Sequence, residues 1–467
     1  MVNWQALASY LPEVSKPLKK KLGFNEKLKW TGVTLVLYYI LLHIPLYGLG
    51  QNSLDQFDQL STILGASFGS VISLGIGPIV TASIVLQLLV GSGILGMDLT
   101  KPDDRSKFQA MQRIVTILFI LMESGIYVLM GGLAPAPALL GTSAYNVFQF
   151  ALIAQLFIGG YLIVLMDELV QKWGFGSGIG IFIAAGVSRQ IFISALSPLV
   201  PLGGSSPAGK IPQLLIALQS SNIAGALVAS AAIIATVIVF MMAVYGQAMK
   251  VEIPLSFGRV RGYGIRWPLK FIYTSNIPVI LIAALLANIQ LMARFLQNWG
   301  RPLLGTFENG VPVSGMVKWL NSPNVVDALI RSGSISGEMI IQSVMYVSVM
   351  VIGAVFFSMM WVKTSNMGAD AQAKQILASG LQIPGFRRDP RVLESILNRY
   401  IPALTIMGGA TVGFLAAFAD LSGALSRGTG ILLTVMIIYK LYEDIAKQHA
   451  YDMHPALRKF MSPENSP

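Results

Sequence analysis

SVISLGIGPIVTASIVLQLLVGS, residues 70–92, has the composition of a membrane-spanning helix that is interrupted near its start. Gly75, Gly77 and Pro78 break the apolar run, and a continuous apolar pattern follows. Because proline is tolerated in the first turn of a helix and poorly inside one, we predict a helix that begins near Pro78, preceded by non-regular backbone. Irregular backbone at membrane depth persists only where it is buried in protein or lines a wet cavity. This segment is therefore a candidate pore wall.

The composition places the whole chain in a membrane. Of its 467 residues, 54% are hydrophobic and 12% are charged, with a mean hydropathy of +0.65. Soluble domains carry about 25% charged residues. The charges cluster between long apolar runs, which indicates helices rather than a barrel. The chain has no cysteine and only the scattered histidines His43, His449 and His454, so no metal site and no cofactor is expected.

The apolar runs predict an all-α membrane protein with ten transmembrane helices. Each run has about the 17–25 residues that a bilayer core requires. The predicted spans are 30–49, 74–92, 109–131, 147–168, 177–196, 222–246, 271–297, 338–362, 401–420 and 429–446.

The positive charges orient these spans. With the N-terminus in the cytoplasm, 26 Lys and Arg residues fall on the cytoplasmic side and seven on the other. The positive-inside rule therefore places both termini in the cytoplasm.

The N-terminal segment 1–29 has its own pattern. Trp4, Leu7, Leu11 and Val14 recur at helical spacing before a run of lysines. This spacing predicts an amphipathic helix at the cytoplasmic interface, and the alternative is a solvated basic tail.

An internal repeat predicts two inverted halves. Gly176-Ser177-Gly178-Ile179 opens span five and Gly428-Thr429-Gly430-Ile431 opens span ten, from opposite sides of the membrane. Such repeats place a functional site at their interface. Glycine-rich starts are common in membrane helices, so coincidence is the alternative. The predicted halves are 30–200 and 201–447, followed by a cytoplasmic tail, 448–467.

Three connecting segments are unusual. Leu54–Gly65 is too short to cross and half polar, which indicates a re-entrant element or an external loop helix. The cytoplasmic loops 250–270 and 363–399 are long and carry spaced arginines, which suit phosphate and above all a nucleic-acid backbone. The alternative is that these charges serve orientation alone.

Four segments together carry a family resemblance. LGIGPIVTASIVLQLLVGSG (74–93), KWGFGSGIGIFIAAG (172–186), FIYTSNIPVILIAALLANIQ (271–290) and RGTGILLTVMIIYKLYE (427–443) resemble the SecY family, the large pore-forming subunits of the Sec protein translocon. The likeness is greatest to archaeal and eukaryotic-type members. It implies two five-helix halves around a central hourglass pore that is closed by a plug helix.

The resemblance implies three groups of pore residues. The constriction ring falls on Ile76, Val80, Ile179, Ile183, Ile280 and Leu433. A polar cluster at a lateral gate, between spans two and three on one side and seven and eight on the other, falls on Thr81, Gln87, Glu123 and Asn288. The plug falls on Leu54–Gly65, with Leu54, Phe57, Leu60, Ile63 and Leu64 as its apolar residues.

The local chemistry is consistent with these roles. Ring residues four apart share one face of a helix, and a neck of aliphatic side chains excludes water and ions by dewetting. The simpler interpretation is packing or lipid contact. Glu123 near the middle of a span is costly unless it is paired, and Asn288 or Thr81 is the expected partner. Ordinary interhelical bonding without gating is the alternative.

The resemblance also implies partners. Arg259, Arg261, Arg387 and Arg388 are expected to contact ribosomal RNA. The small SecE/gamma and beta subunits would complete a heterotrimer, and signal peptides, nascent secretory or membrane proteins and lipid would be the other partners. The expected location is the plasma membrane of a prokaryote, archaeal by the resemblance.

The predicted function is a signal-gated channel that passes unfolded secretory polypeptides and releases hydrophobic segments sideways into lipid. The alternative is a small-solute secondary transporter, which needs charged groups at the midplane. Among the residues of the predicted spans, only Glu123 fits that need. The chain has no Walker-type phosphate loop and no His–Glu–x–x–His motif, so an enzyme is not expected.

Overall fold

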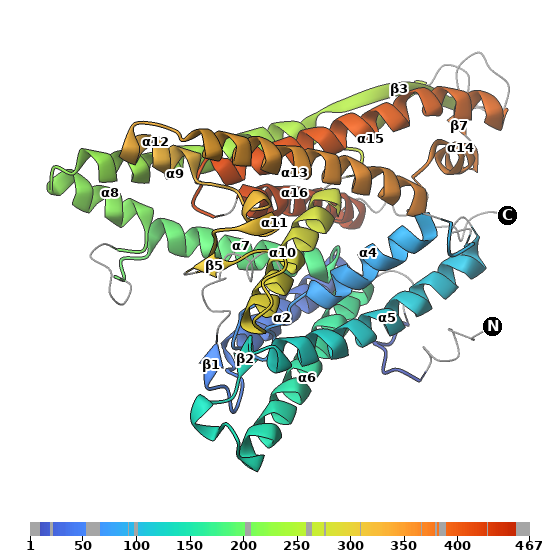
Figure 1. Ribbon diagram of the computed structural model, residues 1–467. Coiled ribbons are helices and arrows are strands. Elements are labelled where there is room, and N and C mark those ends of the chain that lie inside the picture. The colour runs from blue at the N-terminus through green and yellow to red at the C-terminus, as the bar shows by residue number, and fades with distance from the viewer. Residues whose placement is uncertain are drawn as a thin grey trace.

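The computed structural model describes residues 10–18, 22–52, 66–91, 93–97, 101–200, 207–257, 264–274, 277–308, 310–365, 367–378, 381–382, 389–426 and 428–453. Long helices dominate it (Figure 1). They are α2 (Phe24–His43), α4 (Gly77–Gly91), α5 (Pro102–Leu129), α6 (Ser143–Trp173), α7 (Gly178–Leu196), α8 (Lys210–Gln219), α9 (Ile223–Ala248), α10 (Ile277–Asn298), α11 (Gly315–Trp319), α12 (Val325–Ser332), α13 (Gly337–Thr364), α14 (Ala369–Ala378), α15 (Pro390–Leu421) and α16 (Gly428–Met453).

Every predicted span overlaps one of these helices. Among the described residues, seven helices are long and apolar enough to cross a membrane, namely α5, α6, α7, α9, α10, α13 and α15. α4 is apolar but shorter. α2 and α16 combine an apolar stretch with a charged end, and α2 lies closer to the N-terminus than the predicted span 30–49. The fold is therefore the all-helical membrane architecture that the sequence predicts.

The helices form two groups. We define them by chain order as α2–α7 and α8–α16. Figure 1 shows α2, α4, α5 and α6 on one side and α9, α13 and α15 on the other. α7 and α16 pack against each other in opposite directions. A Cβ at Gly180 would lie 3.5 Å from Ile437, and a Cβ at Gly430 would lie 3.2 Å from Val187. The last helix of each group thus runs antiparallel to its counterpart.

The predicted interruption before α4 is confirmed. Residues 70–76 form successive turns, with Gly75 at a φ of 54°, and the helix begins at Gly77. The side chain of Ser73 is fully buried, and its hydroxyl donates to the Ser70 carbonyl at 2.5 Å and accepts the Gly69 N–H at 2.9 Å. The irregular backbone is therefore hydrogen-bonded within the protein, as membrane depth requires.

A glycine on α6 accommodates this segment. A Cβ at Gly159 would lie 1.9 Å from the carbonyl oxygen of Val71, and a Cβ at Gly160 would lie 2.8 Å from Ile120. The absence of side chains here lets α6 approach the backbone of residues 70–76 directly.

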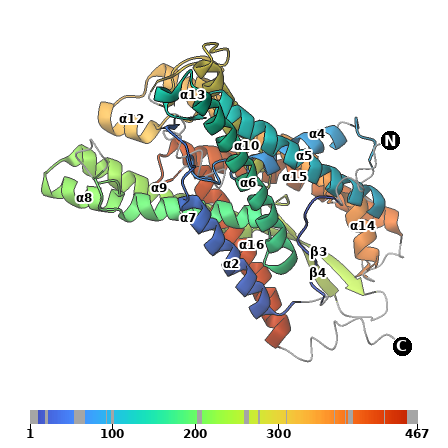
Figure 2. The ribbon, with the colours of Figure 1, turned by 90° about the horizontal axis from the view of Figure 1, so that it is seen from below.

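A small sheet joins the two segments that the sequence predicts as basic cytoplasmic loops. β3 (Lys250–Phe257) and β4 (Gly264–Lys270) form an antiparallel hairpin in which Lys250 pairs with Lys270. β7 (Leu381–Gln382), from the second loop, pairs with β3 so that Phe257 faces Leu381. Figures 1 and 2 show this sheet near α14, at one end of the molecule.

A separate apolar core supports this sheet. It contains residues of the hairpin, of α14 and of the first half of α15, namely Ile253, Leu269, Ala369, Ala373, Ile376, Leu393, Leu397, Ile401 and Leu404. The hairpin, β7, α14 and the start of α15 are called the platform below.

The remaining regular elements are short and connect the helices. β1 (Gln51–Asn52) pairs with β2 (Leu133–Ala134), and β5 (Phe307–Glu308) pairs with β6 (Val311–Pro312). A 3₁₀ turn spans Pro137–Leu139.

The N-terminal residues 10–18 are not helical, so the predicted amphipathic helix does not include Leu11 and Val14. The rest of that prediction, residues 1–9, lies outside the described residues. The segment instead docks on α5 and α6. Arg113 of α5 pairs with Glu13 and with Glu168 of α6, each at 3.2 Å.

Lys172 completes this network. It pairs with Glu13 and donates to the Val14 carbonyl at 2.7 Å. The hydrogen bond from Lys172 and the charge of Arg113 hold the pKa of Glu13 below its ordinary value of 4.5.

Substitution of Gly159 tests the packing around residues 70–76. Gly159→Ala places a methyl group against the Val71 carbonyl, which requires a backbone shift. Overpacking of this kind costs about 1–3 kcal/mol, so the thermal unfolding temperature of the purified protein should fall. Gly125→Ala on α5 is the matched control, because its Cβ would meet nothing within 4 Å. Equal unfolding temperatures for the two variants would contradict the packing described here.

Candidate functional site

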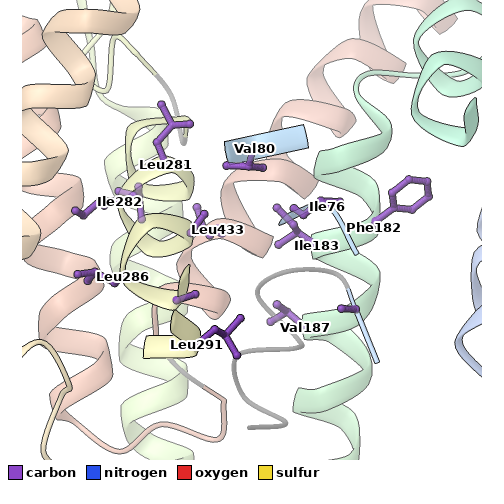
Figure 3. Close-up of a cluster of buried hydrophobic side chains, with 14 of the residues drawn as sticks. Ile76, Val80, Phe182, Ile183, Val187, Leu281, Ile282, Leu286, Leu291 and Leu433 are labelled. Atoms are coloured by element: carbon purple, nitrogen blue, oxygen red, sulfur yellow. The ribbon is translucent and has the colours of Figure 1, made fainter. Parts of the chain in front are cut away.

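The six residues predicted for the constriction lie in one apolar cluster. Ile76, Val80, Ile183 and Leu433 are buried, and Ile179 and Ile280 are partly buried against the same core. They come from α4 and the residue before it, α7, α10 and α16, which are far apart in the sequence. Figure 3 shows Leu433 between Ile76 and Ile183 on one side and Ile282 of α10 on the other. These six residues are called the collar.

Local structure explains how two residues of the collar are held. Ile76 precedes the first residue of α4, yet the Val80 N–H donates to the Ile76 carbonyl at 3.0 Å. The two side chains therefore keep the helical i, i+4 relation that the sequence predicts, although one of them belongs to the irregular segment.

A cavity of about 600 Å³ ends at the collar. Val80, Ile179 and Ile280 line it together with polar side chains of α5, α6 and α16, which are Gln112, Gln171, Lys440 and Asp444. Three of the six collar residues therefore face a partly polar cavity.

A polar contact joins the two helix groups at the predicted gate. Asn288 of α10 donates to the Thr81 hydroxyl of α4 at 2.9 Å, and that hydroxyl donates to the Gly77 carbonyl at 2.9 Å. The side chain of Glu123 on α5 also lies beside Thr81. The structure therefore brings three of the four predicted gate residues together.

Gln87 is the exception. Its amide donates to Ser83 of the same helix at 2.9 Å, and its side chain is buried. Its carbonyl oxygen has no hydrogen-bond partner in the described part of the chain.

The contact of α4 with α10 and α13 is called the seam below, and it extends to the end of α4. A Cβ at Gly91 would lie 2.0 Å from the terminal carbon of Met360 on α13. α4 therefore contacts both α10 and α13, the two helices that the sequence predicts on the far side of the gate.

The other predicted site residues lie outside the described residues. These are the apolar plug residues Leu54, Phe57, Leu60, Ile63 and Leu64, and the arginines Arg259, Arg261, Arg387 and Arg388. The strands that precede these arginines in the sequence are described, and Phe257 of β3 pairs with Leu381 of β7.

Two aspartates were not predicted as site residues. Asp167 and Asp420 lie near span ends and suggest interfacial groups, but both are buried, and each accepts a backbone N–H from the first turn of the next helix, α7 or α16. An available signal was an acidic residue shortly before each glycine-rich helix start. Among the described residues, no cluster of His, Cys, Asp and Glu is suited to a metal ion.

The comparisons with known proteins agree with this geometry. A family model described as SecY matches residues 70–442, and a model of the plug domain of Sec61p matches residues 36–69. The protein translocase subunit SecY of Methanothermobacter thermautotrophicus is 47% identical over 98% of each chain. That of Pyrococcus furiosus is 42% identical over 97% of each chain.

Solved structures agree as well. One described as a protein conducting channel has a TM-score of 0.82 at 41% identity and covers 97% of this chain and 99% of its own. Sec61 in the canine ribosome-channel complex from the endoplasmic reticulum has a TM-score of 0.80 at 40% identity, with the same coverage.

The fold and the site define a multi-pass membrane channel with an apolar neck between two helical groups. The chain belongs to the SecY family. Its function is therefore that of a channel-forming translocase subunit and not that of an enzyme.

The polar contact at the seam can be tested by its effect on closure. Asn288→Leu removes the donor to Thr81, and a hydrogen bond between membrane helices contributes about 0.6 kcal/mol, so the open–closed equilibrium should shift about threefold toward opening. Cysteines at Gly91 and Met360, in this otherwise cysteine-free chain, report closure by crosslinking. Crosslinking should slow in Asn288→Leu and stay normal in Thr81→Ser, which keeps the hydroxyl. An unchanged rate in Asn288→Leu would show that the bond does not hold the seam.

Proposed function

We propose that this chain is the pore of a translocon that passes unfolded secretory polypeptides through the collar and releases hydrophobic segments through the seam. The convergence of six aliphatic side chains from distant parts of the sequence, at the end of a partly polar cavity, is the observation that carries the proposal.

The collar suits a passage that is tight when empty. A narrow apolar neck excludes water and ions by dewetting. When a polypeptide enters, aliphatic side chains part without leaving hydrogen-bonding groups unpaired, whereas a polar neck would pay the cost of broken bonds. The same residues therefore close the pore at rest and surround the polypeptide loosely during its passage.

The seam suits lateral release. The Asn288–Thr81 bond is weak enough to yield to a signal peptide. Once the helices part, each Leu, Ile, Phe or Val of a passing segment favours lipid by about 0.3–0.6 kcal/mol at the helix centre.

The alternative of a small-solute secondary transporter is not supported. Such proteins bind ions and substrates with polar groups at the midplane. Here the residues that meet at the neck are aliphatic, and Glu123 lies at the seam beside Thr81.

The partners follow from the platform and the family. Sec61, a relative in structure, is part of a ribosome-channel complex. We assign the same partner to this chain, with Arg259, Arg261, Arg387 and Arg388, which follow β3 and β7 in the sequence, as contacts to ribosomal RNA. SecE/gamma and beta subunits would complete the assembly.

The topology and domain division also belong to this proposal. The charge asymmetry supports cytoplasmic termini in the membrane of an archaeal cell. The two functional halves are 30–200 and 201–447, and the plug, Leu54–Gly65, falls within the match to the plug-domain model.

Crosslinking to a stalled secretory chain tests the pore. Single cysteines at Ile76, Val80, Ile179, Ile280 and Leu433 should each react with a cysteine placed in the part of the chain held in the membrane. Leu37 is the matched control, because it is 43% exposed on α2 and lies outside the collar. Reaction at the collar no greater than at position 37 would refute the channel.

Charge reversal tests the platform. Replacing the four arginines by glutamate should weaken binding to ribosomes by about an order of magnitude or more and reduce its dependence on salt, because phosphate contacts release counterions. Binding is measured by co-sedimentation over a salt series. Arg331→Glu is the control and should bind normally. Arg331 belongs to α12, which follows α10 and precedes α13 in the sequence. If the quadruple variant binds like the control, the ribosome contacts lie elsewhere.

A further inference from the structure

Each helix group contains one buried aspartate beside its last span. Asp167 of α6 is 7% exposed and Asp420 of α15 is 8% exposed. A carboxylate that is buried away from water is costly unless it is hydrogen-bonded, so two such groups in matching positions call for a physical reason.

Asp167 is bound to the start of α7. Its Oδ1 accepts the Ile179 N–H at 3.0 Å, and its Oδ2 accepts the Gln171 side-chain amide at 2.8 Å. A Cβ at Gly178 would lie 2.6 Å from the Asp167 Cα, so glycine permits this close approach. Ile179 is itself a residue of the collar.

Asp420 is bound to the start of α16 in the same way. Its Oδ1 accepts the Thr429 N–H at 3.0 Å. Its Oδ2 accepts the Thr429 hydroxyl and, at 2.5 Å, the Tyr346 hydroxyl of α13. Leu433 of the collar lies one turn after Thr429, on the same side of α16.

The packing of α7 against α16 connects these two sites. Gly180 faces Ile437 and Val187 faces Gly430, so Ile183 and Leu433 lie between these two contacts. The aspartates bind the first turns of the two helices, which are at opposite ends of this antiparallel pair.

We propose that Asp167 and Asp420 are positioning residues that fix the axial position of α7 and α16, and so keep the collar closed at rest. This inference rests on the proposed channel function. Apolar packing alone does not fix a helix along its axis well, because the hydrophobic effect is non-directional. A hydrogen bond that a carboxylate accepts from a first-turn N–H is directional. It also satisfies an otherwise unpaired N–H, and the negative charge interacts favourably with the helix dipole.

Ion leakage of the resting channel tests this role. The full-length chain, reconstituted in lipid vesicles with its small subunits, should be tight. Asp167→Ala and Asp420→Ala should each increase ion flux several-fold, without any translocating chain. Asp167→Asn and Asp420→Asn keep an oxygen that accepts the same N–H and should restore a tight channel.

Two further variants separate positioning from general stability. Thr429→Pro removes the N–H that Asp420 accepts, while proline is tolerated in the first turn of a helix; it should leak even if an alanine variant fails to accumulate. Asn222→Ala removes a similar cap from α9, where Asn222 accepts the Gly225 N–H at 3.0 Å. α9 contributes no residue to the collar, so this variant should stay tight.

The outcomes are distinct. Folded alanine and proline variants that are as tight as the original chain would overturn the proposal, as would equal leakage in Asn222→Ala. Translocation of a secretory chain is measured in the same vesicles. Its failure in the unsubstituted complex would refute the proposed function, whereas normal translocation without leakage in the variants would refute only the role of the aspartates.

Discussion

Backbone polar groups at membrane depth must find partners inside the protein, and the segment before α4 depends on this constraint. Residues 70–76 leave the helical path, so their N–H and C=O groups are satisfied by local turns and by the hydroxyl of Ser73. They must also be shielded from lipid, which α6 achieves through Gly159. Ile76, the first residue of the collar, lies at the end of this enclosed segment. A residue of the collar is thus held on irregular backbone by the helices packed around it.

Interactions of different strength serve different parts of the molecule. At the seam, the bond between Asn288 and Thr81 joins the two helix groups, and such bonds are weak. At the helix starts beside the collar, Asp420 accepts three hydrogen bonds in a buried site. The contacts that must open are therefore few, while those that locate the neck are several and buried. This division allows one part to move while the other stays in register.

Part of the site was predictable because its signals are local. Pro78 correctly placed the start of α4, and the four-residue spacing of Ile76 and Val80 correctly gave a common face. The two partners expected for Glu123, Asn288 and Thr81, are hydrogen-bonded to each other, and Glu123 lies beside Thr81. The pairing of β3 with β7 gave no signal, since β7 is a two-residue strand far along the chain. The burial of Asp167 and Asp420 was not predicted, because burial at a span end depends on the neighbouring helix and not on the local sequence.

The pairing of Phe257 with Leu381 has a consequence for biosynthesis. The hairpin of β3 and β4 can form as soon as its own residues are made, but its third strand and the helices beneath it come from a much later part of the chain. The platform is therefore completed only after α10 and α13 have been synthesised. Most of the chain must therefore be synthesised before this surface exists.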